Sequence, residues 1–256
     1  MKSISELKSE ALSSLNEKWG ISVGCTLIFF VIGVALSLIP YIGNIASILV
    51  SGALSVGICN FFLLVSKSEN VEIDDLFVAF KSKDLFLSSL VAYLLSGAII
   101  IPTVLIFGGI WVTLFLGDIE NLAQLISPSA YGDGTSAAPY TLDPSFLNPY
   151  SSPIFESGIV TILLSLFIIV LVPLIIVSLI LSQVFFILAD KKTNSGLEAI
   201  KMSWNLMKYK KTKLFLLQLS FIGWAILSIL TLFIGFIFLQ PYIYTTLSKF
   251  YKELND

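Results

Sequence analysis

Three carboxamide side chains are the polar groups whose spacing could place them together inside apolar segments. Asn60, Gln183 and Gln218 each lie five to seven residues from a charged residue that bounds its segment. Because an α-helix rises about 1.5 Å per residue, all three are expected at a similar depth, one to two turns from the same end of the helices. They could line a small polar cavity or bind a lipid headgroup, and they could equally form hydrogen bonds that hold helices together.

The chain contains few of the residues that commonly act in catalysis. There is no histidine, the most common general base and metal ligand at neutral pH. No Asp, Glu or Lys lies deep in an apolar segment, and no Gly-rich phosphate loop is visible. Cys25 and Cys59 lie within apolar runs, where thiols react poorly. We therefore predict a non-enzymatic protein without catalytic, metal-binding or cofactor-binding residues.

The composition indicates a protein of the lipid bilayer. Of 256 residues, 56% are hydrophobic and only 12% are charged, against roughly 25% charged in soluble domains. The apolar runs are too long for buried core helices. A net charge of −2 argues against a nucleic-acid partner. We expect an all-α, polytopic helical membrane bundle with six transmembrane helices in three hairpins.

Amphipathic segments precede the three apolar blocks. They cover residues 3–19, 73–80 and 195–207, with apolar side chains at helical spacing. The first and third begin with the capping-box pattern S-x-x-E, at Ser3 and Ser195. Such helices are expected to lie in the cytoplasmic interface of the membrane, with lysines reaching toward the headgroups.

We expect a single membrane domain over residues 1–256, which consists of six consecutive parts. A turn at residues 40–43 separates the first two spans, and central prolines, Pro102 and Pro173, occur in the next two. These prolines could form a gate or could simply fit the bundle. The predicted parts are an amphipathic leader (1–19), spans one to three (20–116), an extracytoplasmic Pro-rich loop (117–157), span four (158–190), a basic cytoplasmic segment (191–213), and the last hairpin and tail (214–256).

Lysine placement decides the number of spans. Leu214–Tyr244 would be about 46 Å long as one helix, against a hydrocarbon core of roughly 30 Å. If this stretch turns at TLFIG (Thr231–Gly235), the chain has six spans and all fifteen basic residues lie on one side. With five spans the tail lysines would lie outside. The positive-inside rule therefore favours six spans, with both termini in the cytoplasm.

Two further segments could contact partners. Lysines of the basic segment would attract anionic lipid headgroups by about 1 kcal/mol each near the membrane surface, or they could serve only to set topology. The loop at residues 117–157 has five prolines and no basic residue. It could recognise a membrane-protein or peptide partner, or be a connector. The predicted lipid contacts are Lys201, Lys208, Lys210, Lys211 and Lys213.

A family resemblance covers most of the chain. Residues 185–254 contain FFILAD, EAIKMSWNLMK, LFLLQLSFIGW, ILTLFIGFIFLQPY and KFYKEL, and residues 52–63 and 74–80 read GALSVGICNFFL and DDLFVAF. These runs resemble a bacterial integral-membrane family known as a domain of unknown function, number nine-seven-five. The resemblance implies a multi-span protein of the bacterial plasma membrane and supplies no activity. Members of that family join the middle spans briefly, whereas this chain has residues 117–157 there.

Two functions of different classes remain open. The first is a non-enzymatic protein that acts through lipid or protein partners, as an accessory of a transport, envelope-stress or peptide-immunity system. The alternative is a transporter or channel-like protein with a small polar cavity at Asn60, Gln183 and Gln218, in the cytoplasmic half. A membrane enzyme acting on lipid is disfavoured because the chain contains neither histidine nor arginine.

Overall fold

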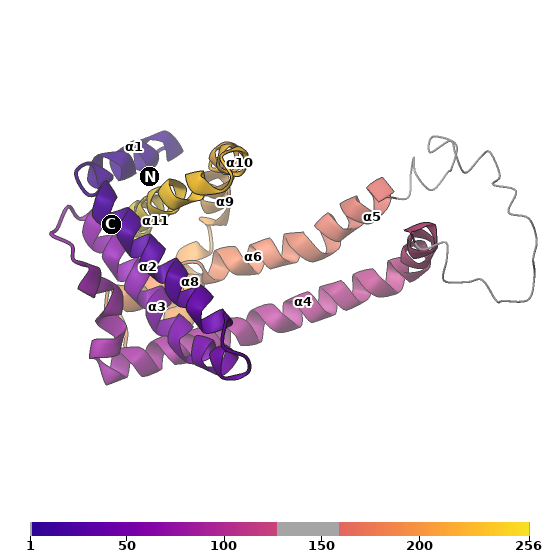
Figure 1. The fold of residues 1–256 in the computed structure, drawn as a ribbon, viewed down its shortest axis with the longest axis horizontal. Helices are drawn as coiled ribbons and strands as arrows, with labels where there is room; N and C mark the ends of the chain where they lie inside the picture. The colour runs from indigo at the N-terminus through magenta and orange to yellow at the C-terminus, as the bar shows by residue number, and fades with distance from the viewer. Residues whose placement is uncertain (1, 127–158, 256) are drawn as a thin grey trace, which may run out of the picture. The chain divides into compact units, whose positions relative to one another are not determined.

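The computed structural model describes residues 2–126 and 159–255, and over these residues the chain is helical without strands (Figure 1). The predicted all-α class is therefore confirmed. Besides α-helices, the chain has a 3₁₀-helix, η1, and a π-helix, η4. The elements are α1 (Ile4–Leu15), α2 (Trp19–Ser37), α3 (Ile42–Ser66), η1 (Ile73–Lys81), α4 (Lys83–Ile126), α5 (Ile159–Leu166), η4 (Phe167–Leu171), α6 (Val172–Leu181), α7 (Val184–Ala189), α8 (Gly196–Met207), α9 (Lys211–Leu219), α10 (Ile222–Leu230) and α11 (Ile234–Asn255).

Five stretches of helix in the described residues are long and apolar enough to cross a membrane. This length and composition are typical of a polytopic membrane protein. The chain forms two compact units: unit 1 is Met1–Ala98 with Ser178–Asp256, and unit 2 is Ile99–Val177. The candidate spans are Trp19–Ser37, Gly43–Ser66, Lys83–Phe115, Thr161–Ala189 and Lys211–Leu230.

The core of unit 1 lies where α3 packs against α11, α7, α2 and η1. Phe61 and Phe62 of α3 are fully buried, and the ring of Phe62 stacks on Tyr244 of α11 with 5.4 Å between centroids. Many large apolar side chains of the candidate spans are instead exposed, among them Phe30 (64%) and Leu230 (75%). Exposed apolar surface of this extent suits a lipid environment rather than water.

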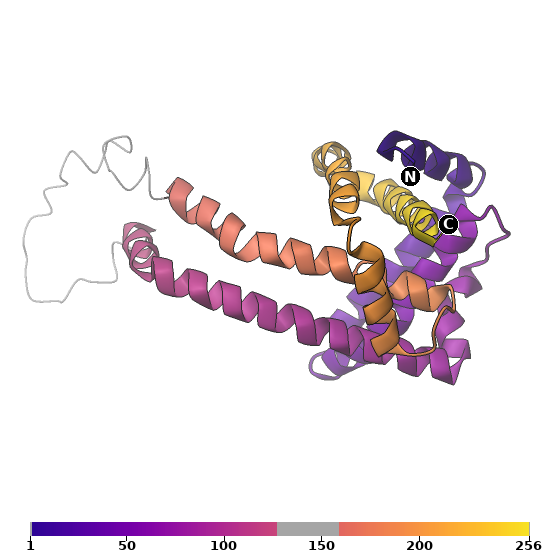
Figure 2. The same ribbon diagram turned by 180° about the vertical axis from the view of Figure 1, so that it is seen from behind.

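The amphipathic segments pack their apolar faces against other helices of unit 1. Leu7, Ala11 and Leu15 of α1 are fully buried, where α1 lies beside α11 (Figures 1 and 2). The predicted capping box of α1 is confirmed, because Ser3 and Glu6 exchange both hydrogen bonds. At α8 only half of the predicted box forms. Ser195 accepts from the Glu198 N–H, but the Glu198 carboxylate accepts from the Thr193 hydroxyl.

Two glycines of α3 allow neighbouring segments to approach the helix backbone. A Cβ atom at Gly57 would lie 1.7 Å from the carbonyl oxygen of Leu76 in η1. At Gly52 it would lie 2.5 Å from the carbonyl oxygen of Ser89 in α4. The close approach expected of small residues in membrane helices therefore occurs at these two positions. Gly24 in α2, by contrast, has no such neighbour within 4 Å.

The stretch between α10 and α11 turns, as the sequence predicts for TLFIG. α10 ends at Leu230, Leu232 and Phe233 have φ of 52° and 68°, and α10 packs against α11. Such positive φ values at non-glycine residues end a helix sharply. α11 itself is not among the five candidate spans, because Gln240, Pro241 and the polar residues that follow them make the helix as a whole less apolar.

Unit 2 comprises the later part of α4 with α5, η4 and the start of α6. Trp111 Nε1 donates to Ser165 Oγ at 3.0 Å, which joins α4 to α5. The π-turn of η4 ends just before Pro173, which has no N–H to give to the preceding turn. α4 continues to Ile126, past the predicted start of the loop at Gly117, and its last turns contain the good helix formers Glu120, Leu122, Ala123, Gln124 and Leu125. The rest of the predicted loop, residues 127–157, lies outside the described residues.

We expect Gly57→Ala to destabilise the protein by about 1–3 kcal/mol, the usual cost of overpacking a tight contact. The added methyl would collide with the Leu76 carbonyl, which is backbone and cannot rotate away. The measurement is thermal unfolding of the detergent-purified protein, followed by circular dichroism.

The matched control is Gly24→Ala, where the methyl meets open space. An alanine within a helix is favoured over glycine by about 0.5–1 kcal/mol, so this variant should unfold at the same temperature or higher. Equal destabilisation of both variants would contradict a specific contact between Gly57 and η1.

Candidate functional site

The last turns of α11 hold the ends of three other helices in unit 1. Lys249 Nζ donates to the carbonyl oxygen of Ser66, the last residue of α3, at 2.7 Å. The Tyr251 hydroxyl donates to the Asp190 carboxylate, just after α7, at 3.3 Å. Farther along, Glu253 accepts from Lys213 Nζ of α9 at 2.9 Å. We call these six residues the tail cluster: Ser66, Asp190, Lys213, Lys249, Tyr251 and Glu253.

Burial strengthens the tail cluster. The Lys213 and Glu253 side chains are only 19% and 10% exposed, so water screens their ion pair weakly. Burial, together with the charge of Asp190, raises the pKa of Tyr251, so the hydroxyl stays a proton donor at neutral pH. Asp190 also lies 3.4 Å from the Lys67 ammonium. Its charge is therefore shared between the ends of α3 and α11.

Lys8 of α1 is a half-buried cation beside the α10–α11 hairpin. Its Nζ donates to both the carbonyl and the hydroxyl oxygen of Ser220, at 3.2 Å each. It also lies 4.4 Å from the centre of the Phe221 ring and 5.8 Å from that of Tyr242. Burial lowers the pKa of Lys8. Across the described part of the chain no carboxylate forms an ion pair with it.

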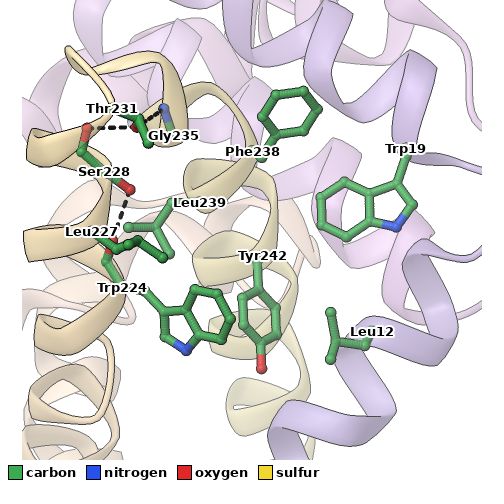
Figure 3. Close-up of a pocket in the computed structure, with 10 residues that line it drawn as sticks. All are labelled: Leu12, Trp19, Trp224, Leu227, Ser228, Thr231, Gly235, Phe238, Leu239 and Tyr242. Carbon is green, nitrogen blue, oxygen red and sulfur yellow. Dashed lines mark hydrogen bonds between the residues drawn. The ribbon is translucent and has the colours of Figure 1, made fainter.

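An apolar cavity of about 310 Å³ lies between α1, the start of α2, and the α10–α11 hairpin (Figure 3). The rings of Trp19, Trp224 and Tyr242 line it, so we call it the Trp19–Trp224 cavity. Hydroxyls in its wall are bonded within the hairpin: Ser228 donates to the Trp224 carbonyl oxygen at 2.8 Å, and Thr231 to that of Ser228 at 3.0 Å. The cavity therefore offers an apolar surface to a ligand. Its other lining residues are Leu12, Leu227, Gly235, Phe238 and Leu239.

A second cavity, of about 580 Å³, lies between α2 and the turn that joins α10 to α11. Its lining includes Thr26, Phe30 and Leu232, with Gln240 of α11 as an amide. The sequence pattern that points to Asn60, Gln183 and Gln218 does not extend to Gln240, because no charged residue lies near Gln240 in the chain.

The three amides singled out in the sequence have different surroundings. Asn60 is half-buried and donates to the Asp75 carbonyl oxygen of η1 at 3.1 Å, which is a bond that holds two segments together. Gln183 is fully buried; its Nε2 donates to Ser182 Oγ at 2.9 Å, and its Oε1 has no partner among the described residues. Gln218 is exposed. Neither cavity described above is lined by any of the three, and a shared polar cavity stays a prediction.

The predicted lipid-binding lysines also differ from one another. Lys201 and Lys208 are exposed, and Lys210 is half-buried. Lys211 Nζ lies 5.5 Å from the centre of the Trp204 ring, whereas Lys213 forms an ion pair with Glu253. Lys8 was not predicted as a contact, because its partner Ser220 lies 212 residues away and no local pattern joins them. Among the described residues, no group of three or more Cys, Asp or Glu side chains is placed to hold a metal ion.

Comparison with known proteins gives one match. A family model described as "Protein of unknown function (DUF975)" matches residues 1–256. Neither the curated proteins nor the solved structures contain a match.

We expect Glu253→Gln to lower the free energy of unfolding by about 1.5–3 kcal/mol, the range for hydrogen bonds to charged groups. The neutral amide cannot form an ion pair with the largely buried Lys213 ammonium, which would be left without its counter-charge. Chemical unfolding in detergent measures the change.

Asp74→Asn provides the comparison for an exposed pair. Asp74 is paired with Lys81, and both side chains are more than half exposed, so the loss should be about 0–1 kcal/mol. If Glu253→Gln were as mild as Asp74→Asn, the tail cluster would not be a main source of stability.

Proposed function

The chain belongs to the family of proteins of unknown function DUF975, and we propose that it is a non-enzymatic membrane protein that acts through lipids and protein partners. It lies in the bacterial plasma membrane in this proposal, with six spans and both termini in the cytoplasm. The sixth span is the first part of α11, which follows the turn at Leu232 and Phe233.

One observation carries the six-span proposal: the two ends of the chain meet at the same end of unit 1. The backbone N–H of Lys2 donates to the Glu253 carboxylate, and α1 packs along α11 (Figures 1 and 2). A chain whose ends lie on one side of a bilayer crosses it an even number of times. Five candidate spans and a returning α11 give that even number.

Charge supports placing this end of unit 1 in the cytoplasm. Lys8 lies in α1, Lys67 and Lys213 lie at helix ends that the last turns of α11 approach, and Lys249 lies in those last turns. A concentration of lysines marks the cytoplasmic side of bacterial membrane proteins. The exposed Lys201 and Lys208 would then face the headgroups of anionic lipids.

The role that fits these features is that of an accessory that holds lipid or a partner protein, within a transport, envelope-stress or peptide-immunity system. Charged groups of the tail cluster bind other residues of the chain: Lys249 donates to Ser66, and Lys213 pairs with Glu253. These contacts suit a structural role. The partner-facing segment in this proposal is 117–157. A transporter with a cavity at the three amides is the alternative, and their different surroundings give it no added support.

Cysteine labelling in intact cells tests the orientation. In a background with Cys25→Ala and Cys59→Ala, we expect Lys252→Cys to react with a membrane-impermeant maleimide only after the cells are permeabilised. Lys252 lies in the tail of α11, which the six-span arrangement places in the cytoplasm.

Ser136→Cys, in the predicted outer segment, is the matched control and should react in intact cells without permeabilisation. Reaction of both positions from outside would mean that the tail is external and that an even number of spans separates the two positions. Reaction of Lys252→Cys alone would mean that the whole orientation is inverted. Either result overturns the proposal.

A further inference from the structure

Lys8 carries a charge that the chain does not neutralise. An ammonium group has three N–H donors, and Ser220 accepts from two of them, at its carbonyl and its hydroxyl oxygen. These acceptors and the Phe221 ring are uncharged. Over the residues that the structure describes, Lys8 therefore keeps one donor and a full positive charge for an anionic partner.

The Trp19–Trp224 cavity lies next to that charge. Tyr242 belongs to both, since its ring lines the cavity and lies 5.8 Å from Lys8 Nζ. Leu12, one helical turn after Lys8 in α1, also lines the cavity (Figure 3). From Tyr242 the lining follows α11 back to Gly235, a rise of about 10 Å. A cation thus lies at one end of an apolar slot that runs along the hairpin.

We propose that Lys8 and the Trp19–Trp224 cavity together bind one anionic phospholipid of the cytoplasmic leaflet. The phosphate accepts the free N–H of Lys8, and part of one acyl chain lies in the cavity, which at about 310 Å³ is at the small end of the range for ligand pockets. The inference rests on the proposed function, because only there does α1 lie in the cytoplasmic interface.

The surroundings match this ligand in two further respects. Indole rings are enriched at the headgroup depth of a membrane, and Trp19 is the first residue of the candidate span Trp19–Ser37, so it would lie at that level beside the slot. In addition, the wall hydroxyls of Ser228 and Thr231 are already bonded to the backbone, so they do not compete for the chain. A peptide or polar solute would leave its own polar groups unsatisfied in such a slot.

Fluorescence quenching by brominated lipid tests the site, because Trp19 and Trp224 line the cavity. The full chain is used in a background with Trp111→Phe and Trp204→Phe, reconstituted in phosphatidylcholine vesicles. Brominated phosphatidylglycerol should quench with an apparent affinity about fivefold higher than brominated phosphatidylcholine, which corresponds to about 1 kcal/mol for one lysine. Lipid that merely surrounds the protein quenches without this headgroup preference.

In Lys8→Gln, the preference should fall to about onefold, whereas Lys8→Arg should keep it. Lys83→Gln removes an exposed lysine of α4 that does not line the cavity, and it should leave the preference unchanged. Circular dichroism of each variant shows that it is folded.

Equal quenching by the two lipids in the parent protein would overturn the proposal. So would an unchanged preference in folded Lys8→Gln, or an equal loss in Lys83→Gln, which would indicate a diffuse effect of charge. The labelling experiment on Lys252 fails or succeeds independently. If the labelling placed the tail outside while Lys8 still selected phosphatidylglycerol, the proposed lipid site would be supported and only the proposed orientation would be wrong.

Discussion

The contact of the last turns of α11 with the ends of α3, α7 and α9 is the constraint on which unit 1 depends. Helices end in carbonyl groups without intrahelical partners, and cations near these ends are favoured. Lys249 meets this need for α3 by donating to Ser66, while Tyr251 and Glu253 hold Asp190 and Lys213. One helix thus supplies polar partners to three others, and the positions of their ends follow from it.

This constraint matters because apolar surface alone does not select one arrangement of helices in a bilayer. Lipid tails are as apolar as leucine, so helix association depends on close packing and polar contacts. Both occur in unit 1: Gly57 lets η1 reach the backbone of α3, and the buried Lys213–Glu253 pair fixes α9 against α11. The exposed apolar faces elsewhere remain available to lipid.

Local features of this fold could be predicted from the sequence, and distant ones could not. The capping box at Ser3, the turn at TLFIG and the breaks between spans depend on neighbouring residues, and all are present. The partner of Lys213 is forty residues away and that of Lys8 is 212 residues away, so only the packed structure brings them together. The three amides are predicted at a similar depth, because depth follows from the number of residues to the end of the helix. The side to which each amide faces depends on how its helix is rotated in the bundle, which no local pattern gives. Burial of Gln183 and exposure of Gln218 are the result.

The place of α11 in the chain has a consequence for biogenesis. α11 follows every other helix of unit 1 in the chain, so α3, α7 and α9 leave the ribosome before the residues that pair their ends have been translated. Until then Ser66, Asp190 and Lys213 lack these partners, although α3 can already pack against η1, α2 and α7. The completion of unit 1 therefore waits for α11, because only that helix supplies these partners.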